Sequence, residues 1–175
     1  MKGRLQSIIN ITGLSIGMAV AMMIGIWIYG ELSFNKNFKN YDRIGQVIQN
    51  LTINGQADTW WSVPYPLSKE IREHYGSDFK HVVMAVNWGD HLVTYGDKKL
   101  KQSGGFFEPG ITDMLSLNMI RGKQNIVADP TSVLISASMA KVYFGKEDPI
   151  NKMLQIDDMP VVKVTSVYKD FPKNS

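Results

Sequence analysis

Cysteine is absent from the 175 residues of this chain. That absence excludes disulfide frameworks, cysteine-ligated zinc, iron–sulfur clusters and thiol nucleophiles. Charge is absent from one long stretch, because no charged side chain lies between Arg4 and Glu31. An excess of basic charge is missing from the rest: seventeen of the nineteen basic and all sixteen acidic residues lie at or after Glu31, which leaves that part with a net charge of +1. The sequence therefore has no basic stripe for a nucleic-acid partner.

Motifs of catalysis and cofactor binding are also missing. No glycine-rich loop is followed by Lys-Ser or Lys-Thr, and Ser136 lies outside a Gly-x-Ser-x-Gly turn. His74, His81 and His91 are single and lack the spacing of metal ligands on a helix. We assign no catalytic, cofactor-binding or metal-binding residue, and the sequence does not indicate an enzyme. One function to consider is that of a membrane-anchored hydrolase. Such an enzyme would need a nucleophile or metal cluster that the sequence does not offer.

The charge-free stretch holds an apolar run. Fourteen of the twenty residues in Ile11–Gly30 are hydrophobic, and only Thr12 and Ser15 are polar. As a helix the run would rise about 30 Å, the thickness of a bilayer's hydrocarbon core. A signal peptide cleaved after Ala19-Val20-Ala21 would leave a very apolar mature end, and a charge-free core helix of this length is unusual in a small domain. We predict an uncleaved transmembrane helix over about residues 8–30.

The flanks of the predicted helix set its orientation. Lys2 and Arg4 precede it, which places the N-terminus in the cytoplasm by the positive-inside rule, although Lys36 and Lys39 on the other side weaken the bias. Trp27 and Tyr29 lie at the outer end of the helix, where aromatic belts form, and we assign these two residues to the membrane interface. The remaining chain is then expected to be extracytoplasmic.

Small residues recur on one face of the same helix. Gly13, Gly17, Ala21 and Gly25 follow one another at intervals of four. Such a small-xxx-small ridge lets a second helix approach closely. Glycine is common in membrane helices, so one pair would carry little weight, but four small residues in series favour a packing face toward other membrane helices.

The chain beyond the helix alternates short strands and short helices. A connector over residues 31–45 carries Phe34, Phe38 and Tyr41 at spacings of four and three, which predicts one helical face. Asn54-Gly55 predicts a hairpin turn, and Gly104-Gly105 is expected to end a strand. Strands are predicted at 46–53, 81–86, 91–95, 98–102, 117–120, 133–135, 153–156 and 161–168, and helices at 67–75, around 112–115, and from a cap at Ser136 through Phe144 to a stop at Gly145. The mixture, without regular βαβ alternation, predicts an α+β domain.

One aromatic cluster stands out in this domain. Trp60 and Trp61 lie beside Pro64-Tyr65-Pro66. Packing in the core is the ordinary interpretation of such a cluster. A contact surface for a partner, formed by Trp60, Trp61 and Tyr65, is the alternative.

The ordered series of segments resembles a known family. Asn10–Ala19, Glu31-Leu32-Ser33-Phe34 and Tyr41-Asp42-Arg43-Ile44 are similar to the start of ABC-transporter permeases with a MacB-like periplasmic core domain. The similarity extends over nearly the whole chain, and none of its segments is catalytic. It continues through Leu115–Gly122, Ser132–Ser136, Ala140–Gly145, Asp148–Lys152 and Val164–Pro172.

The resemblance implies a role that composition does not. Members of this family carry an N-terminal transmembrane helix, a periplasmic domain and three further transmembrane helices, and they work as dimers with a cytoplasmic ATPase. It therefore implies a bacterial inner-membrane permease that transmits ATP hydrolysis to periplasmic movement in export or extraction from the envelope. The implied partners are the ABC ATPase, a second permease copy, the lipid bilayer, and in some members a periplasmic adaptor or outer-membrane channel.

The domain division follows from both arguments. We expect a cytoplasmic lead-in and transmembrane helix in residues 1–30, the connector in 31–45, and the periplasmic core domain in 46–175. Because the family's domain is longer and the chain has one apolar run, we expect an N-terminal fragment of a permease. The alternative function is a single-pass, membrane-anchored extracytoplasmic binding or sensor domain, which sequence following Ser175 would distinguish.

Overall fold

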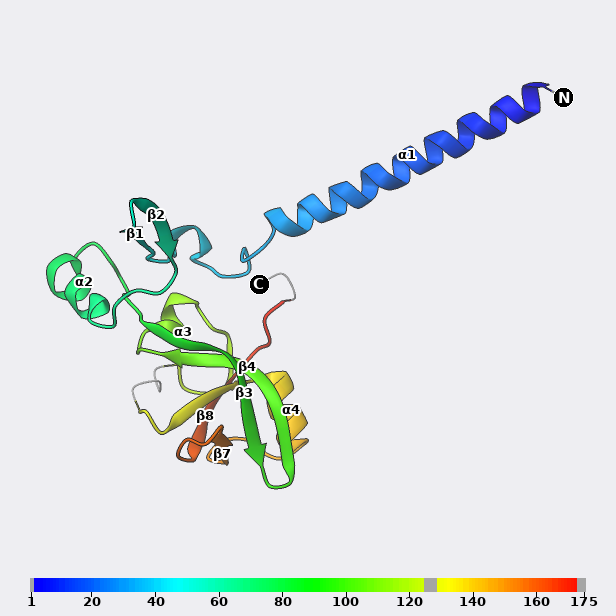
Figure 1. Ribbon diagram of the computed structural model, residues 1–175. Coiled ribbons are helices and arrows are strands. Elements are labelled where there is room, and N and C mark those ends of the chain that lie inside the picture. Colours follow the sequence, from blue (N-terminus) through cyan, green and yellow to red (C-terminus); the bar gives the residue numbers. More distant parts are fainter. Residues whose placement is uncertain (1, 125–128, 173–175) are drawn as a thin grey trace. The chain divides into compact units, whose positions relative to one another are not determined.

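The computed structural model describes residues 2–124 and 129–172 and divides into two units (Figure 1). The first unit is built on the helix α1, Lys2–Leu32, and extends to Asn37. The second unit runs from Phe38 to Asp170 and contains every strand that the structure describes. Each unit is described below by itself.

Helix α1 is one continuous apolar helix. Its segment Gln6–Leu32 is long and apolar enough to cross a membrane, and no part of the apolar window is buried in the described structure. The interpretation of this run as a buried core helix is therefore wrong. The predicted helical face of Phe34, Phe38 and Tyr41 is also wrong, because turns follow Leu32. Asn35 has a φ of 60°, a left-handed conformation that stops a right-handed helix.

Among the residues that the structure describes, the second unit contains eight strands, three α-helices and one 3₁₀ helix. Most of the predicted elements are present, and several begin or end within a few residues of their predicted limits. In chain order the elements are η1 Tyr41–Arg43, β1 Gln49–Ile53, β2 Gln56–Trp60, α2 Leu67–Tyr75, β3 Ala85–Tyr95, β4 Lys98–Phe107, α3 Ile111–Met114, β5 Met119–Gly122, β6 Ser132–Ser136, α4 Ala137–Phe144, β7 Met153–Ile156 and β8 Val162–Tyr168.

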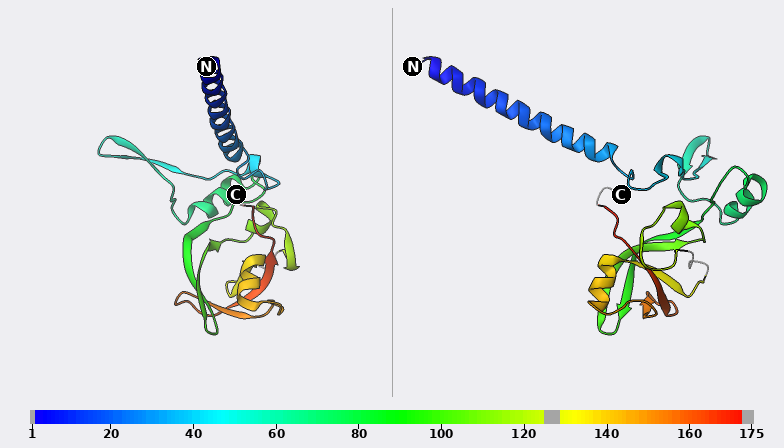
Figure 2. Two further views of the ribbon diagram at one scale, coloured as in Figure 1. Left: turned by 90° about the vertical axis from the view of Figure 1, so that its right-hand side faces the viewer. Right: turned by 180° about the vertical axis from the view of Figure 1, so that it is seen from behind.

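The strands form two sheets. Six strands make a mixed sheet in the order β4-β3-β7-β8-β5, with β6 paired to β8. The β6–β8 pair is parallel, whereas the other pairs of this sheet are antiparallel. Strands β1 and β2 pair only with each other and form a hairpin that stands apart from the six-stranded sheet (Figure 2). A mixed helix and sheet domain after an apolar helix confirms the predicted α+β class.

The core lies where α4 covers the six-stranded sheet. Ser136 caps α4 by accepting a hydrogen bond from the Met139 amide at 3.2 Å, and Gly145 ends the helix with a φ of 64°, as predicted. The Tyr143 hydroxyl donates to the Val93 carbonyl at 3.0 Å, which ties α4 to β3. The buried apolar side chains are Val93, Ile135, Tyr143, Phe144, Leu154, Val164 and Val167.

Two strand predictions are wrong for the same reason. The predicted strand 91–95 is part of a longer strand, β3, which also takes in Ala85 and Val86 across an irregularity between Val86 and Gly89, whereas residues 81–84 of the predicted strand 81–86 lie outside any strand. Strand β4 continues through Gly104-Gly105 instead of ending there, and Gly104 pairs with Gly89 of β3. Local glycine content predicted a break, but the ladder of the neighbouring strand holds both segments extended.

The hairpin turn follows its predicted chemistry. Asn54 and Gly55 have φ angles of 52° and 78°, and the strands on either side are in register from Ile53–Gln56 to Gln49–Trp60. Positive φ at both central positions is the requirement of a type I′ turn, which asparagine and glycine meet at little cost. The strand before the turn begins at Gln49, three residues later than predicted.

Candidate interaction surfaces

The small-residue ridge of α1 is open in the described structure. Gly13, Gly17, Ala21 and Gly25 are all exposed, and a Cβ atom built on any of the three glycines meets nothing within 4 Å. Because a step of four residues advances by about 40° around a helix, the ridge winds obliquely along α1. Ridges of this kind suit the close, right-handed crossings of paired membrane helices. Its role as a packing face stays a prediction.

The polar side chains near the start of α1 bond to their own helix. The Ser7 hydroxyl donates to the Gly3 carbonyl at 3.0 Å, and the Thr12 hydroxyl donates to the carbonyls of Ile8 and Ile9. Such bonds satisfy hydroxyl groups without water, as a bilayer requires. Near the other end, Trp27 and Tyr29 are 66% and 74% exposed, so both are free to meet a membrane interface.

The aromatic cluster lies on the surface of the second unit. Trp60, Trp61 and Tyr65 are 41%, 73% and 71% exposed. Packing of Trp60 and Trp61 in the core, the ordinary interpretation of the sequence, is therefore wrong. Every residue of β2 is exposed, which leaves this strand without a layer above it in the described structure. The three aromatic side chains remain a candidate partner surface.

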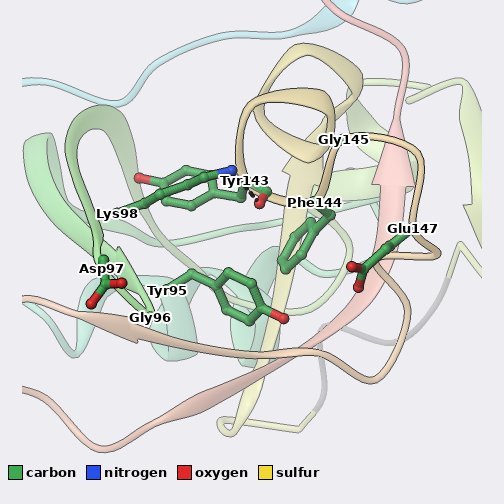
Figure 3. Close-up of a pocket in the computed structure, with 8 residues that line it drawn as sticks. All are labelled: Tyr95, Gly96, Asp97, Lys98, Tyr143, Phe144, Gly145 and Glu147. Carbon is green, nitrogen blue, oxygen red and sulfur yellow. Dashed lines mark hydrogen bonds between the residues drawn. The ribbon is translucent and has the colours of Figure 1, made fainter.

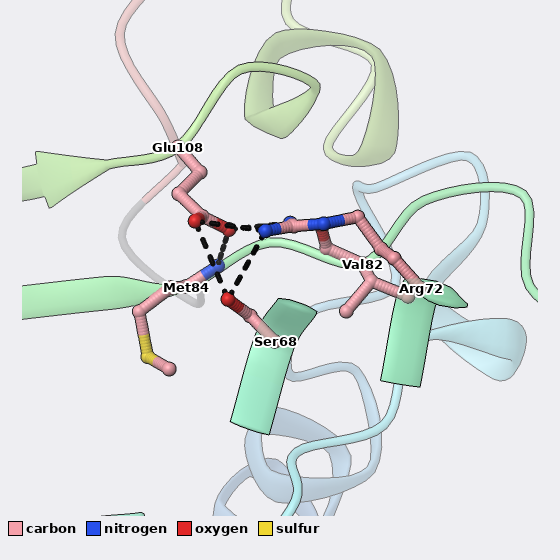
Figure 4. Close-up of polar contacts among 5 residues, drawn as sticks. All are labelled: Ser68, Arg72, Val82, Met84 and Glu108. Carbon is pink, nitrogen blue, oxygen red and sulfur yellow. Dashed lines mark hydrogen bonds and ion pairs between the residues drawn. The ribbon is translucent and has the colours of Figure 1, made fainter. Parts of the chain in front are cut away.

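A polar cluster ties α2 to the six-stranded sheet (Figure 4). Glu108, at the end of β4, accepts hydrogen bonds from both terminal nitrogens of Arg72, at 2.6 and 3.0 Å, and from the Met84 amide at 3.0 Å. Ser68, one turn before Arg72 on α2, donates to the same carboxylate at 3.3 Å. Arg72 also donates to the Val82 carbonyl at 2.9 Å. The cluster joins α2 to the chain entering β3 and leaving β4.

The cluster gives Glu108 a pH-dependent contribution to stability. Its pKa lies below the ordinary value because Arg72 donates to the carboxylate, with the Met84 amide adding to the effect against partial burial. Glu108 therefore stabilises the fold above the pKa of an unfolded glutamate, and this contribution is lost as the pH falls through the lower folded pKa.

Replacement of Glu108 by glutamine is expected to remove that contribution. Because Arg72 is 41% exposed, we expect a loss on the order of 1 kcal/mol at neutral pH. Urea unfolding at pH 7 and pH 3 measures it, and the difference between wild type and Glu108→Gln should shrink at the lower pH. The matched control is Glu73→Gln on the same helix, whose carboxylate is 54% exposed and 3.7 Å from Lys69. Equal losses in both variants at both pH values would contradict the role of the cluster.

A hollow of about 400 Å³ lies between the β3–β4 turn and the end of α4 (Figure 3). The Lys98 ammonium group donates to the carbonyls of Val142 and Tyr143 at 2.9 and 2.8 Å. It therefore caps the carbonyl end of α4, where a positive charge is favoured. The rings of Tyr95 and Phe144 meet edge to face at 4.7 Å. These side chains fasten α4 to the hairpin of β3 and β4.

The histidines have structural neighbours. The buried His91 ring lies with Nδ1 2.7 Å from an Asp157 carboxylate oxygen, and the other oxygen accepts from the Leu92 amide at 2.7 Å. The His74 ring lies 3.4 Å from Glu70 on the same helix. Within residues 2–124 and 129–172, no three histidine, aspartate or glutamate side chains are placed to hold a metal ion.

Sequence reasoning missed two groups that the fold brings together. Ser68 and Arg72 are four residues apart on a predicted helix, so a shared face could have been recognised. Their partner Glu108 lies 36 residues after Arg72, and nothing in the local pattern marks it. Asp157 lies in the turn after β7, and its carboxylate accepts a hydrogen bond from the Leu92 amide of β3, which is 65 residues away in the chain.

An exposed apolar helix followed by a mixed helix and sheet domain defines a class of membrane-associated protein with an extramembrane domain. Residues 7–175 match the family described as the MacB-like periplasmic core domain, and the chain belongs to this family. The resemblance inferred from the ordered segments is thus confirmed. Comparison with curated protein sequences gives no match.

Two solved structures show a related fold. A domain of a protein described as a permease from Porphyromonas gingivalis is 21% identical, with a TM-score of 0.58 over 69% of this chain and 52% of that chain. The extracellular domain of YknZ, a noncanonic ABC-type transporter from Gram-positive bacteria, is 21% identical, with a TM-score of 0.50 over 59% of this chain and 55% of that one. The aligned part is about half the length of each of these structures.

Proposed function

We propose that this chain is the first transmembrane helix and periplasmic domain of an ABC-type permease that transmits ATP hydrolysis to movement on the outer side. Membership of the MacB-like periplasmic core domain family carries the proposal. We further propose that residues 1–30 form the lead-in and membrane helix, 31–45 the connector and 46–175 the periplasmic domain. In this role the N-terminus lies in the cytoplasm and the domain in the periplasm, with the inner membrane between them.

The proposed partners divide between the two sides of the membrane. A cytoplasmic ABC ATPase supplies the energy, and a second permease copy completes a dimer. A periplasmic adaptor or outer-membrane channel is the proposed partner on the other side. No catalytic step is assigned to the chain itself, whose part in the cycle is to carry movement along α1 to the domain.

The ridge of α1 supports a helix-to-helix contact in this assembly. Its three glycines let two backbones approach closely, so that leucine at these positions holds the helices apart. Gly17→Leu combined with Gly25→Leu is expected to lower recovery of a second tagged copy by about tenfold, which corresponds to about 1.4 kcal/mol. The measurement is co-purification from membranes, together with ATP hydrolysis by the recovered complex.

The control adds the same side chain to the opposite face. Ala19 lies about 200° around the helix from Gly17, so that Ala19→Leu adds bulk away from the ridge. This variant should keep both co-purification and ATP hydrolysis. Unchanged recovery of the double glycine variant would overturn the packing role of the ridge. Permease copies that recover no ATPase activity in wild-type form would overturn the proposed function.

A further inference from the structure

The hairpin β1–β2 and the segments beside it form a surface with almost no charge. One charged side chain, Asp58, occurs in the 24 residues from Gly45 to Ser68, although 20% of the whole chain is charged. Its carboxylate accepts a hydrogen bond from the Trp60 indole at 2.8 Å, so it is already engaged within the hairpin. We call residues 45–66 the aromatic hairpin segment.

The same segment is exposed and apolar. Its large apolar side chains present much of their surface to solvent, most of all Trp61 at 73% and Tyr65 at 71%. The register places Leu51, Ile53 and Trp60 on one face of the hairpin together with Gln49, Gln56 and Asp58, whereas the opposite, more polar face carries Asn50, Thr52, Ala57 and Thr59. On that polar face the Thr59 hydroxyl donates to the Asn50 side chain at 2.9 Å. The hairpin therefore presents apolar side chains beside uncharged polar ones, with Asp58 as its single charge.

An exposed two-stranded hairpin with apolar side chains is expected to contact another surface. Strands β1 and β2 pair with no other strand in the part of the chain that the structure describes, and an isolated two-stranded hairpin is marginally stable in water. Clustered exposed apolar residues mark sites of contact with a protein or a membrane. Tryptophan and tyrosine are the side chains enriched where a bilayer meets water, because each has an apolar body and a polar group.

Two observations favour lipid over a protein partner. The segment carries a single charge, Asp58, which is already engaged with Trp60, whereas protein partners are steered and oriented by several charges; an uncharged amide such as that of Gln56 suits a hydrated headgroup layer. The hairpin is also tethered to a candidate membrane span. Between Leu32 at the end of α1 and Gln49 at the start of β1, the chain extends at most about 60 Å. The tether keeps the hairpin at high effective concentration near the bilayer surface.

We propose that the aromatic hairpin segment lies on the outer leaflet of the membrane and places Trp61 and Tyr65 among the lipid headgroups. Ligands of this surface are phospholipids, bound at a depth of about 5–10 Å. The contact holds the domain against the bilayer surface, so that movement of α1 acts on a domain that is itself in contact with the membrane. The inference rests on the proposed membrane insertion of α1.

The absence of cysteine allows a direct test with single labels. The whole chain is reconstituted in phosphatidylcholine–phosphatidylglycerol nanodiscs and labelled with an environment-sensitive fluorophore at Gln56→Cys, beside the hairpin turn. Asp97→Cys in the exposed β3–β4 turn is the matched control, and Ser15→Cys in α1 reports insertion of the helix. Quenching by spin-labelled lipid and by aqueous iodide is measured at each site.

The expected result separates the three sites. Lipid quenching at Gln56→Cys should be several-fold stronger than at Asp97→Cys, iodide quenching should be correspondingly weaker, and Trp61→Glu should abolish the difference. Equal iodide quenching at Gln56→Cys and Asp97→Cys would overturn the proposal. Protection of Gln56→Cys from both quenchers would overturn it in favour of a protein cover, either a second copy or another segment. Absence of lipid quenching at Ser15→Cys would instead overturn the membrane insertion of α1, and with it the proposed function.

Discussion

Gly122→Ala is expected to destabilise the second unit by about 3–5 kcal/mol. Gly122 ends β5 with a φ of 80°, a conformation that side chains with a Cβ atom rarely adopt. A Cβ atom at this position would lie 2.3 Å from the Thr165 carbonyl oxygen and 2.8 Å from the Ser166 Cα atom. Both atoms belong to the backbone of β8, so relief requires the two strands to separate.

A second glycine isolates the steric part of this effect. Gly96 also has a positive φ, of 55°, but nothing lies within 4 Å of a Cβ atom built there. Gly96→Ala should therefore cost only the conformational penalty, about 1 kcal/mol. Urea unfolding followed by circular dichroism compares the two variants. Equal losses in both would contradict the close approach of β5 and β8.

Leu154→Ala is expected to cost about 2–5 kcal/mol, because it deletes buried methyl groups and leaves a cavity. Leu154 lies on β7 with none of its surface exposed, within the cluster that joins the six-stranded sheet to α4. Thermal unfolding should show a midpoint lowered by several degrees for a unit of this size.

The matched control for the cavity is a leucine of the neighbouring strand. Leu92 lies on β3 and is 46% exposed, so its truncation should change the unfolding free energy by less than about 1 kcal/mol. A loss at Leu92→Ala as large as that at Leu154→Ala would place the core elsewhere than the α4 side of the sheet.

The two surfaces and the polar cluster suggest how the parts of the proposed permease are connected. Helix α2 is tied to the sheet by Glu108 and Arg72, and the aromatic hairpin segment precedes α2 directly in the chain. If the hairpin is held at the membrane as we propose, it would transmit force to the sheet through this ion pair. Loss of the pair in Glu108→Gln would then weaken coupling as well as stability.

Local chemistry determined several elements of the fold. Asn54-Gly55 specified its turn, Ser136 and Gly145 specified the two ends of α4, and the proline before Leu67 marked the start of α2. These features depend on residues a few positions apart, so their patterns are visible in the sequence. The long apolar run and the small-residue ridge are local in the same sense.

Contacts between distant residues decided the rest. The sequence by itself determined a bilayer-length helix without charge, an α+β domain and membership of a permease family, because periodicity, caps and an ordered series of segments are properties of the linear chain. Only the tertiary structure decided that β4 runs through two glycines, that Glu108 meets Arg72, and that Trp60 and Trp61 lie on the surface. Strand pairing and burial depend on partners that are far away in the chain, and an aromatic residue has the same local pattern whether a second layer covers it or not.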